Sequence, residues 1–379
     1  MTSERIFLSK LRNVTDMYPI LFRIPGIGQE GIPIYGFGLM LFIAFLVCTW
    51  LAAKRAKAKG LSPTLIQDMS VWIFVSGLLG ARVLFLYEQK LSFSEFLWNF
   101  PRIWDGGIIL YGSVAGGVAG FTLFWWLYMR PEKIHPLDIV DTLAPSVALG
   151  IALGRIGCLL NGCCFGLVVE PSQPTRAIHF PLSAPARHDL VHSGLQTALG
   201  FTLTNSTDKP GIIVGVVEAG SNAAKIGIQP GDIITQVDGK PVNNAFEFAM
   251  IVSGNWPRGK ETITLDISRR GPITLHPEGL ALHPAQIYET ISMVLLMFLL
   301  LSFEPFQSRV GQLTSILMMA YAMHRFLNEQ LRSDPRPVSL ESNVSVFLFL
   351  AGFLMLLWVQ FFGSPGKPLG SQDKEASPA

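Results

Sequence analysis

Charged residues are scarce in this sequence. Asp, Glu, Lys and Arg make up 15% of its 379 residues, whereas soluble globular domains carry about 25%. The formal net charge is only +2, and no segment alternates basic with aromatic residues as a nucleic-acid groove would require. Half of the residues are hydrophobic. The composition is therefore typical of a membrane protein and argues against a nucleic-acid-binding protein.

Several catalytic and targeting motifs are also missing. The seven histidines do not form the His-Glu-x-x-His pattern that a membrane zinc protease needs, and the Gly-x-Ser-Gly pattern of rhomboid proteases is absent. The four cysteines and the histidines show no clear zinc-ligand spacing, so we expect neither a metal ion nor another cofactor. The N-terminus lacks the pattern of a cleavable signal peptide.

Long apolar stretches dominate what is present. A hydrocarbon core of ~30 Å needs roughly 20 apolar residues per helix. Seven stretches reach or approach this length, namely residues 32–53, 67–88, 108–129, 136–158, 286–303, 310–329 and 342–366. We therefore predict an all-α polytopic membrane protein with about seven transmembrane helices.

Basic residues in short loops indicate the orientation. The clusters at residues 54–59 and 130–133 predict two cytoplasmic loops in the cytoplasmic (inner) membrane, with the N-terminus outside and the C-terminus inside. The basic residues of the N-terminal arm argue for the opposite orientation, but the cluster beside the first span is denser.

Residues 167–285 interrupt the membrane pattern. "GIIVGVVEAGSNAAKIGIQPGDIITQVDGKPVNN" (211–244) and "ETITLDISRRG" (261–271) alternate like strands, with Gly, Pro and Asn at the turns, and residues 222–228 predict a short helix. This stretch resembles a small, β-rich PDZ domain, and the parity of the spans places it on the outer, periplasmic side. The resemblance implies that Leu199, Gly200 and Phe201 receive the C-terminus of a peptide or protein partner, which adds a strand to the sheet. The alternative is a rigid spacer whose groove is unused.

Ionisable residues recur inside the apolar stretches, where charge is costly and usually functional. They are Arg82, Asp141, Arg155, Glu289, Arg325 and Glu329. Any one of these could simply pair with another to hold helices together. The excess of arginine instead favours a buried polar chamber for an anionic phospholipid head group, because the guanidinium fork binds phosphate.

Six segments together resemble the prolipoprotein diacylglyceryl transferase family. They occur along the chain as "YGFGLM" (35–40), "GARVLFLYE" (80–88), "WDGGIILYGSVAGG" (104–117), "VDTLAP" (140–145), "GRIGCLLNGCCFG" (154–166) and "HPAQIYE" (283–289). The spacing of Tyr321, Arg325 and Glu329 completes the resemblance. The resemblance implies transfer of a diacylglyceryl group from phosphatidylglycerol to the lipobox cysteine of a secreted prolipoprotein. The PDZ-like insert is not part of the usual family pattern.

The resemblance also implies site residues. Arg155 and Arg325 would stabilise the leaving phosphate, and His283 or Tyr111 would take the thiol proton. Substrate binding would fall to Tyr35, Arg82, Asn161, Gly166, Gln286, Tyr288, Glu289, Tyr321 and Glu329. The partners expected are phosphatidylglycerol, the prolipoprotein signal peptide and membrane lipid.

The chain departs from the family pattern at positions of functional interest. Tyr111 stands where the family usually has histidine, and a phenol is a poor base at neutral pH. Cys158 and Cys163 replace an asparagine and a glutamate of the signature loop. The protein is therefore either an active transferase or a catalytically divergent paralogue that acts as a membrane-anchored PDZ scaffold.

The cysteines keep several roles open. Cys48 lies mid-span and suits simple packing. Cys158 can pair with Cys163 or Cys164 as a disulfide outside the cytoplasm, all three can serve only packing, or one can act as a nucleophile.

The predicted domains are an N-terminal arm (1–31), helices one to four with the signature loop (32–168), the PDZ-like domain (195–275), helices five to seven (280–363) and a disordered tail (364–379).

Overall fold

The chain forms two compact units in a computed structural model. The structure describes residues 20–25, 32–102, 109–169, 177–205, 211–249, 251–252, 256, 260–268, 270–277, 279–332 and 338–365. Unit 1 comprises Met1–Leu41, Gly154–Thr290 and Phe326–Ser342, and unit 2 comprises Phe42–Leu153, Ile291–Arg325 and Asn343–Ala379. Most of the N-terminal arm and the tail from residue 366 onward lie outside the described residues, as do residues 103–108 of the "WDGG" segment.

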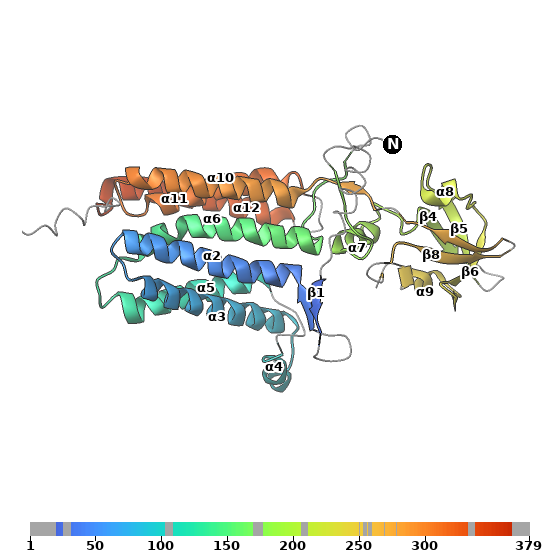
Figure 1. Cartoon of the computed structure of the whole chain (residues 1–379), viewed down its shortest axis with the longest axis horizontal. Helices are drawn as coiled ribbons and strands as arrows, with labels where there is room; N and C mark the ends of the chain where they lie inside the picture. The colour runs from blue at the N-terminus through green and yellow to red at the C-terminus, as the bar shows by residue number, and fades with distance from the viewer. Residues whose placement is uncertain are drawn as a thin grey trace, which may run out of the picture. The chain divides into compact units, whose positions relative to one another are not determined.

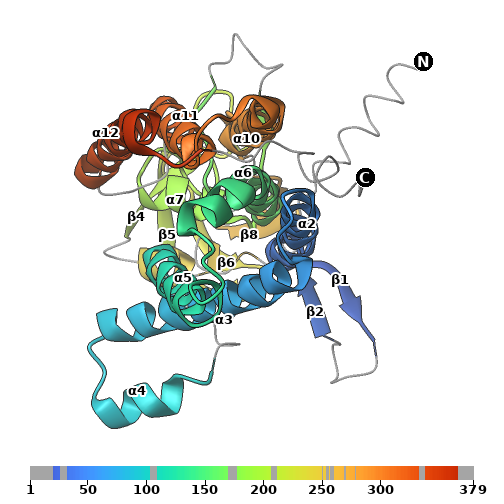
Figure 2. The same cartoon turned by 90° about the vertical axis from the view of Figure 1, so that its left-hand side faces the viewer.

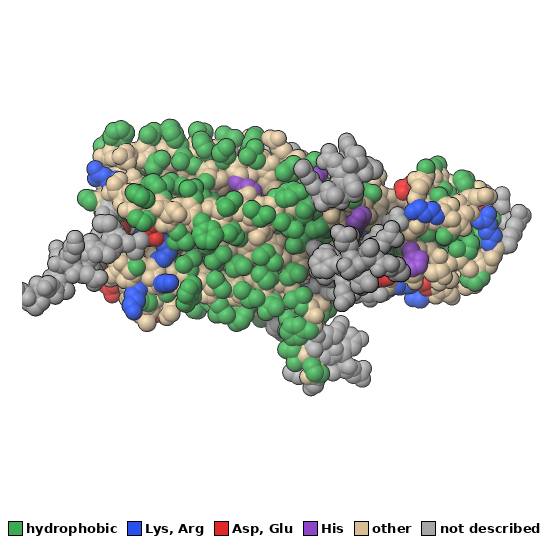
Figure 3. Space-filling view, turned by 45° about the horizontal axis from the view of Figure 1, so that its top comes forward, with side chains coloured by type: hydrophobic (Ala, Val, Ile, Leu, Met, Phe, Trp, Pro, Cys, Tyr) green, Lys and Arg blue, Asp and Glu red, His purple; other side chains and the backbone are tan. Residues whose placement is uncertain are grey.

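Five helices in the described part of the chain are long and apolar enough to cross a membrane (Figure 1). They are α2 (Gly36–Ala58), α3 (Pro63–Glu88), α6 (Pro136–Asn161), α10 (Ala285–Phe303) and α12 (Val338–Phe362). Hydrophobic side chains cover most of the helical surface on the face shown in Figure 3. Such a surface would be costly in water and suits lipid, so the mostly helical, multi-pass prediction is confirmed.

The count of seven spans is not confirmed. The stretch expected at 108–129 forms α5 (Leu110–Phe124), which has 15 residues and continues as a π-helix, η3 (Trp125–Met129). The stretch expected at 310–329 forms α11 (Gln312–Glu329), which has 18 residues and carries polar side chains at both ends. The 3-10 turn η6 (Glu304–Phe306) follows α10, and the short α4 (Phe93–Asn99) follows α3.

Glycines allow α3 and α5 to pack closely in unit 2 (Figure 2). A Cβ atom added to Gly80 would overlap the carbonyl oxygen of Gly112, and one added to Gly116 would overlap that of Ser76. A Cβ on the neighbouring Gly117 would make only an ordinary contact, 3.6 Å from Ile73. Gly116 therefore allows the backbones of α3 and α5 to approach closely, as small residues do between helices of membrane proteins.

Residues of the predicted insert form a six-stranded antiparallel sheet in unit 1. The strands are β4 (Phe201–Asn205), β5 (Ile212–Val217), β6 (Ile233–Val237), β7 (Lys240–Pro241), β8 (Ile263–Ile267) and β9 (Gly271–Leu275). The order is β4-β5-β6-β8-β9, with β7 paired to β6, so β4 is an edge strand. Two short helices accompany the sheet: α8 (Asn222–Lys225), as predicted, and α9 (Ala245–Ala249), which packs beside β4.

The core of this sheet follows from strand alternation. In β8, Ile263, Leu265 and Ile267 are buried while the residues between them are half-buried. Successive side chains of a strand point to opposite faces, so these three reach the same cluster as Ile212 and Ile234. The strand pattern predicted from "ETITLDISRRG" is confirmed.

A small connecting region of unit 1 adjoins the sheet. It contains the pair β3 (Ile178–His179) and β10 (Ala281–Leu282), together with α7 (Pro185–His192). A hairpin of β1 (Ile20–Ile24) and β2 (Ile32–Tyr35) precedes α2 (Figure 2).

Buried Arg187 joins α7 to the sheet region. Its guanidinium donates to the carbonyl oxygens of Ala198 (2.5 Å) and Val252 (3.2 Å) and lies 4.8 Å from the ring centre of Trp256. Burial lowers the pKa of this guanidinium to about 10. Because a buried charge costs free energy unless it is hydrogen-bonded, these contacts tie the connecting region and the sheet together.

Candidate active site

The ends of three helices that lie in unit 1 meet at an ion pair between a half-buried arginine and a buried glutamate. Arg155 on α6 places Nε 2.9 Å from Oε1 of Glu289 on α10. Glu289 is 1% exposed, and Asn328 of α11 donates from Nδ2 to its second carboxylate oxygen at 2.8 Å. A buried carboxylate needs such partners, since an isolated charge would be strongly destabilising. The predicted residues Arg155 and Glu289 are thus brought together.

The chain turns sharply after α6 and brings three thiols close together. α6 ends at Asn161, and Gly162 follows with a φ of +69°. Cys164 also takes a left-handed conformation, with a φ of +61°, which is uncommon for a side-chain-bearing residue. The Sγ atoms of Cys158, Cys163 and Cys164 lie within 4.8 Å of one another, and all three residues are free thiols.

Gly166 connects this turn to α10 and to the chain after α11. Its N–H donates to the carbonyl of His283 at 2.9 Å, and the next N–H, of Leu167, donates to that of Leu331 at 2.9 Å. A Cβ added to Gly166 would lie 2.7 Å from the His283 carbonyl oxygen. Only glycine fits at this close approach.

The first turn of α10 and the residues just before it supply three further predicted residues. Gln286 donates from Nε2 to the carbonyl of Cys163 at 2.7 Å. His283 Nδ1 lies 3.2 Å from the Tyr288 hydroxyl. These contacts hold the signature loop against α10, so Gly166, His283, Gln286 and Tyr288 belong to one neighbourhood with Arg155 and Glu289.

Arg332 is a residue that sequence reasoning missed. It is 9% exposed, and its backbone forms a bridge with that of Gly166. The pKa of the Cys164 thiol is lowered, because its sulfur accepts hydrogen bonds from Cys158 and Cys163 and because Arg332 and Arg155 place positive charge nearby. Because α11 ends at Glu329, Arg332 lies beyond the helix, and no helical spacing in the sequence could have pointed to it.

Two buried amide oxygens in this neighbourhood have no hydrogen-bond partner among the described residues. They are Oε1 of Gln286 and Oδ1 of Asn328, on side chains that are 1% and 3% exposed. Buried polar atoms are nearly always hydrogen-bonded. The two oxygens therefore mark a place where a hydrogen-bond donor is needed. We refer to Arg155, the three cysteines, Gln286, Glu289, Asn328 and Arg332 as the Arg155 cluster.

A second buried polar group, in unit 2, is fully bonded. The Asp141 carboxylate accepts from Gln307 Nε2 (2.5 Å), from the N–H of Gly311 (2.5 Å) and from the N–H and hydroxyl of Thr314 (2.8 and 2.6 Å). Asp141 thereby satisfies free N–H groups at the start of α11.

Close to Asp141, two basic residues in the last turn of α2 and just after it form ion pairs with the buried Glu304 of η6. Arg55 Nη2 lies 2.6 Å from Glu304 Oε1, and Lys59 Nζ lies 3.3 Å from the same oxygen. Arg55 also donates to the backbone carbonyl of Thr142. We refer to Arg55, Asp141, Glu304, Gln307 and Thr314 as the Asp141 cluster; for these residues the contacts explain the burial of polar groups without a ligand.

Four predicted site residues belong to unit 2. Arg82 is buried and donates from Nη2 to the carbonyls of Asn99 and Arg102, both at 2.8 Å, beyond the end of α4. Tyr111 is 63% exposed. Tyr321 packs against an apolar cluster, and Arg325 is half-buried. That these four residues share one chamber with Arg155 remains a prediction.

The remaining predicted residues lie in unit 1. Tyr35 ends β2 and is 49% exposed. Asn161 ends α6, and Glu329 is half-buried at the end of α11. Their predicted roles in substrate binding are not decided by these positions.

The sequence as a whole matches one family. The family model described as prolipoprotein diacylglyceryl transferase matches residues 19–358. The chain belongs to this family. A phosphatidylglycerol–prolipoprotein diacylglyceryl transferase of Clostridium tetani is 24% identical over 346 residues, which are 89% of this chain and 96% of the relative. One of Clostridium perfringens is 22% identical over 86% of this chain and 91% of the relative.

A third relative matches over a shorter length. The protein of the same name from Rhodopirellula baltica is 30% identical over 215 residues, which are 54% of this chain and 42% of the relative. The Arg155 cluster lies within the residues that the transferase family model matches. Together with the five apolar helices, membership in this family indicates an inner-membrane multi-pass protein.

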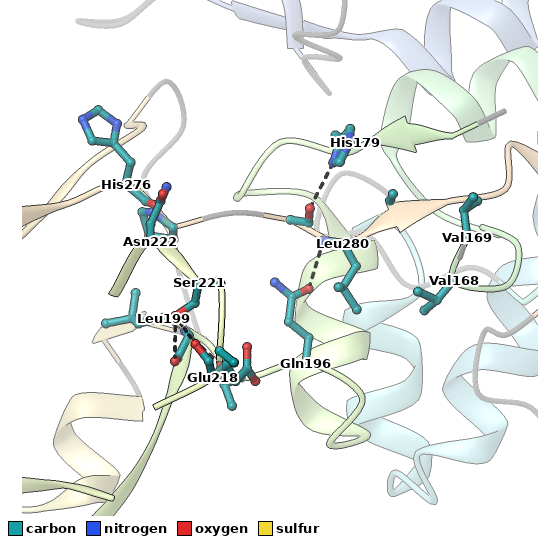
Figure 4. Close-up of a pocket in the computed structure, with 17 residues that line it drawn as sticks. Val168, Val169, His179, Gln196, Leu199, Glu218, Ser221, Asn222, His276 and Leu280 are labelled. Atoms are coloured by element: carbon teal, nitrogen blue, oxygen red, sulfur yellow. Dashed lines mark hydrogen bonds between the residues drawn. The ribbon is translucent and has the colours of Figure 1, made fainter. Parts of the chain in front are cut away.

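Unit 1 also contains a cavity of about 750 Å³ where the connecting region meets the sheet (Figure 4). Gln196 and Leu280 line it and share a hydrogen bond of 3.4 Å, and Nδ1 of His179 lies 3.0 Å from the carbonyl oxygen of Gly279. Other residues around it include Val168, Val169, Leu199, Glu218, Ser221, Asn222 and His276.

The predicted peptide-carboxylate residues lie at the start of β4. Leu199 and Phe201 are each 3% exposed and belong to the sheet core. Gly200 has a φ of +86° and donates its N–H to Thr197 Oγ1 at 2.9 Å. The backbone turns tightly at Gly200, and the Gly200 N–H already has a partner in Thr197.

Proposed function

We propose that this protein transfers a diacylglyceryl group from phosphatidylglycerol to the thiol of the lipobox cysteine in secreted prolipoproteins. The family match over residues 19–358 supports this activity, as do relatives that carry that name. At the level of particular atoms, the proposal depends on the half-buried Arg155 of α6, which is paired with the buried Glu289 of α10.

Arg155 would stabilise the negative charge on the leaving phosphate. The thiolate sulfur attacks the terminal glyceryl carbon, the carbon–oxygen bond to phosphate breaks, and glycerol phosphate departs with an added negative charge. The contact with Glu289 uses Nε, and a guanidinium carries five N–H donors. Preformed donors aimed at developing charge are the largest catalytic term in many enzymes. Arg325 is proposed to act on the same phosphate.

The two unpartnered amide oxygens suit the head group. Phosphatidylglycerol ends in a glycerol with two free hydroxyls, and hydroxyls are hydrogen-bond donors. Gln286 Oε1 and Asn328 Oδ1 are buried acceptors beside the Glu289 carboxylate. We assign them to recognition of the glycerol hydroxyls, with Tyr288, Asn161 and Gly166 in the same neighbourhood.

The other family positions keep their proposed roles. Tyr35, Tyr321 and Glu329 would shape and gate the chamber, and Arg82 would support it by fixing the chain after α4. For the base, the hydrogen bond between His283 and Tyr288 favours His283 over the exposed Tyr111.

We further propose seven spans, with α5–η3 and α11 crossing the membrane beside the five longer helices, and the insert on the periplasmic side. The domain boundaries are proposed at residues 1–31, 32–168, 195–275, 280–363 and 364–379. Residues 195–275 would act as a PDZ-like domain. The edge position of β4 beside α9 supports strand addition by a peptide C-terminus at Leu199–Phe201.

A second candidate function is an inactive transferase scaffold that presents this domain to partners. It is favoured by Tyr111, Cys158 and Cys163, which depart from the usual family residues at positions of functional interest. The two candidates predict different chemistry at the Arg155 cluster.

The deciding experiment is a lipidation assay. The purified full chain is incubated in phosphatidylglycerol nanodiscs with a lipobox peptide, and mass spectrometry follows the gain of one diacylglyceryl group. The active transferase gives this product with the wild type and with Arg130→Ala, an exposed control. The absence of product from folded wild type would favour the scaffold.

A further inference from the structure

The three thiols of the Arg155 cluster form a potential metal-binding set. Their sulfur atoms all lie within 4.8 Å of one another. Three sulfurs bound to one Zn²⁺ at about 2.3 Å each would lie ~4 Å apart, so binding needs only small side-chain movements. Among the described residues, no histidine or carboxylate completes the group. The set therefore offers three ligands and one open position.

The backbone is shaped to bring these thiols together. Cys158 lies on the last turn of α6, and the left-handed residues Gly162 and Cys164 reverse the chain so that Cys163 and Cys164 face back toward it. A left-handed conformation at a residue with a side chain carries strain, which persists where surrounding contacts enforce it. The hydrogen bond from Gln286 to the Cys163 carbonyl is one such contact.

The thiols lie in the Arg155 cluster, in which the backbone of the almost fully buried Arg332 forms a bridge with that of Gly166, two residues after Cys164. A disulfide would use two of the sulfurs and leave the third without a role, whereas a soft metal ion uses all three. Three protein ligands with an open fourth position are characteristic of catalytic zinc.

We propose that Cys158, Cys163 and Cys164 bind a Zn²⁺ ion whose open position takes the thiol of the acceptor cysteine. This inference rests on the proposed transferase function. A thiol that coordinates zinc is deprotonated, and the proposed base His283 would accept the proton. The bound sulfur then forms the bond to the glyceryl carbon, and glycerol phosphate leaves with the electron pair of the broken carbon–oxygen bond, with no change of oxidation state. The ion would supply the deprotonation for which Tyr111 is poorly suited.

The first test measures metal content. The full chain is purified anaerobically in detergent, equilibrated with Zn²⁺ and desalted, and its zinc is measured by mass spectrometry. We expect about one Zn²⁺ per chain in the wild type and in Cys48→Ser, the matched control outside the cluster. We expect at least tenfold less in the triple variant Cys158→Ser/Cys163→Ser/Cys164→Ser. Equal zinc in wild type and triple variant would overturn the proposal, as would a native disulfide between these cysteines or a preference for copper.

The second test asks whether the open position binds a thiol. With Co²⁺ in place of Zn²⁺, we expect the thiolate-to-metal absorption to change on adding a lipobox peptide but not the same peptide with serine for cysteine. Identical spectra with both peptides would overturn the acceptor role.

Lipidation measured in parallel separates the two proposals. Metal binding and a thiol response without a lipidated product would support the metal site and refute the transferase. Undiminished lipidation by the metal-free triple variant would support the transferase and refute the zinc.

Discussion

The Asp141 cluster and the Arg155 cluster both place charged groups among apolar helices, but they differ in how completely their atoms are bonded. Around Asp141, the carboxylate accepts four hydrogen bonds, and Arg55 and Glu304 pair directly. Around Arg155, two amide oxygens are unpartnered among the described residues and three thiols converge. The Arg155 cluster thus retains polar atoms that can bind a ligand, whereas the Asp141 carboxylate is fully hydrogen-bonded.

The largest expected effect is on catalysis at Arg155. Arg155→Ala should lower transfer by about 100-fold or more, as removal of a preformed donor to developing charge does. Arg155→Lys should recover little, because lysine lacks the planar fork. The measurement is the rate of peptide lipidation in phosphatidylglycerol nanodiscs, with Arg130→Ala as control. Full activity of Arg155→Ala would remove the phosphate role.

The matching change in the Asp141 cluster should act on stability instead. Asp141→Ala leaves the N–H groups of Gly311 and Thr314 without their acceptor, which should cost more than about 2 kcal/mol. Thermal unfolding in detergent measures this, and Asp68→Ala on exposed α3 surface is the control. The folded fraction should keep its turnover number. A stable Asp141→Ala protein without activity would break the comparison between the two clusters.

A smaller effect is expected where α3 and α5 pack. Gly116→Ala introduces a Cβ that overlaps the Ser76 carbonyl, so we expect a loss of roughly 1–3 kcal/mol from overpacking. Gly117→Ala, one residue away, meets only Ile73 at 3.6 Å and should be near neutral. Thermal unfolding of the two variants side by side is the measurement, and equal melting temperatures would contradict close packing at Gly116.

The smallest effect on basal activity is expected from removing the insert. Deleting 195–271 and joining the ends with a flexible linker should leave transfer to a short lipobox peptide unchanged but alter the relative rates for full-length preproteins. Competition between two preproteins, read by mass spectrometry, measures the ratio. The thermal unfolding of the helices serves as a folding check. An unchanged ratio would leave the insert as a spacer.

Much of the fold could be predicted from residue patterns. Long apolar runs predicted α2, α3, α6, α10 and α12, because a helix in lipid must satisfy its backbone internally. Strand alternation predicted β8. The count of seven spans is not confirmed, because α5 has only 15 residues and α11 carries polar side chains at both ends.

The candidate site was predictable in part. Arg155 and Glu289 stood out as charges in apolar segments, and their ion pair is observed. Arg332 and Asn328 were missed, because polar residues near a helix end are ordinary in sequence and only their burial is unusual. Asp141 stood out equally, yet its contacts are those of a helix cap.

The amino-acid order alone determined that the chain is a multi-pass membrane protein with a β-rich interruption, because hydrophobic length and strand alternation are local properties. It also carried the motifs that the family shares. Tertiary structure decided which buried charges are satisfied and that Cys158, Cys163 and Cys164 share one place. Both results depend on contacts between segments that are far apart in the sequence. The local sequence pattern of one segment does not specify which other segment it contacts.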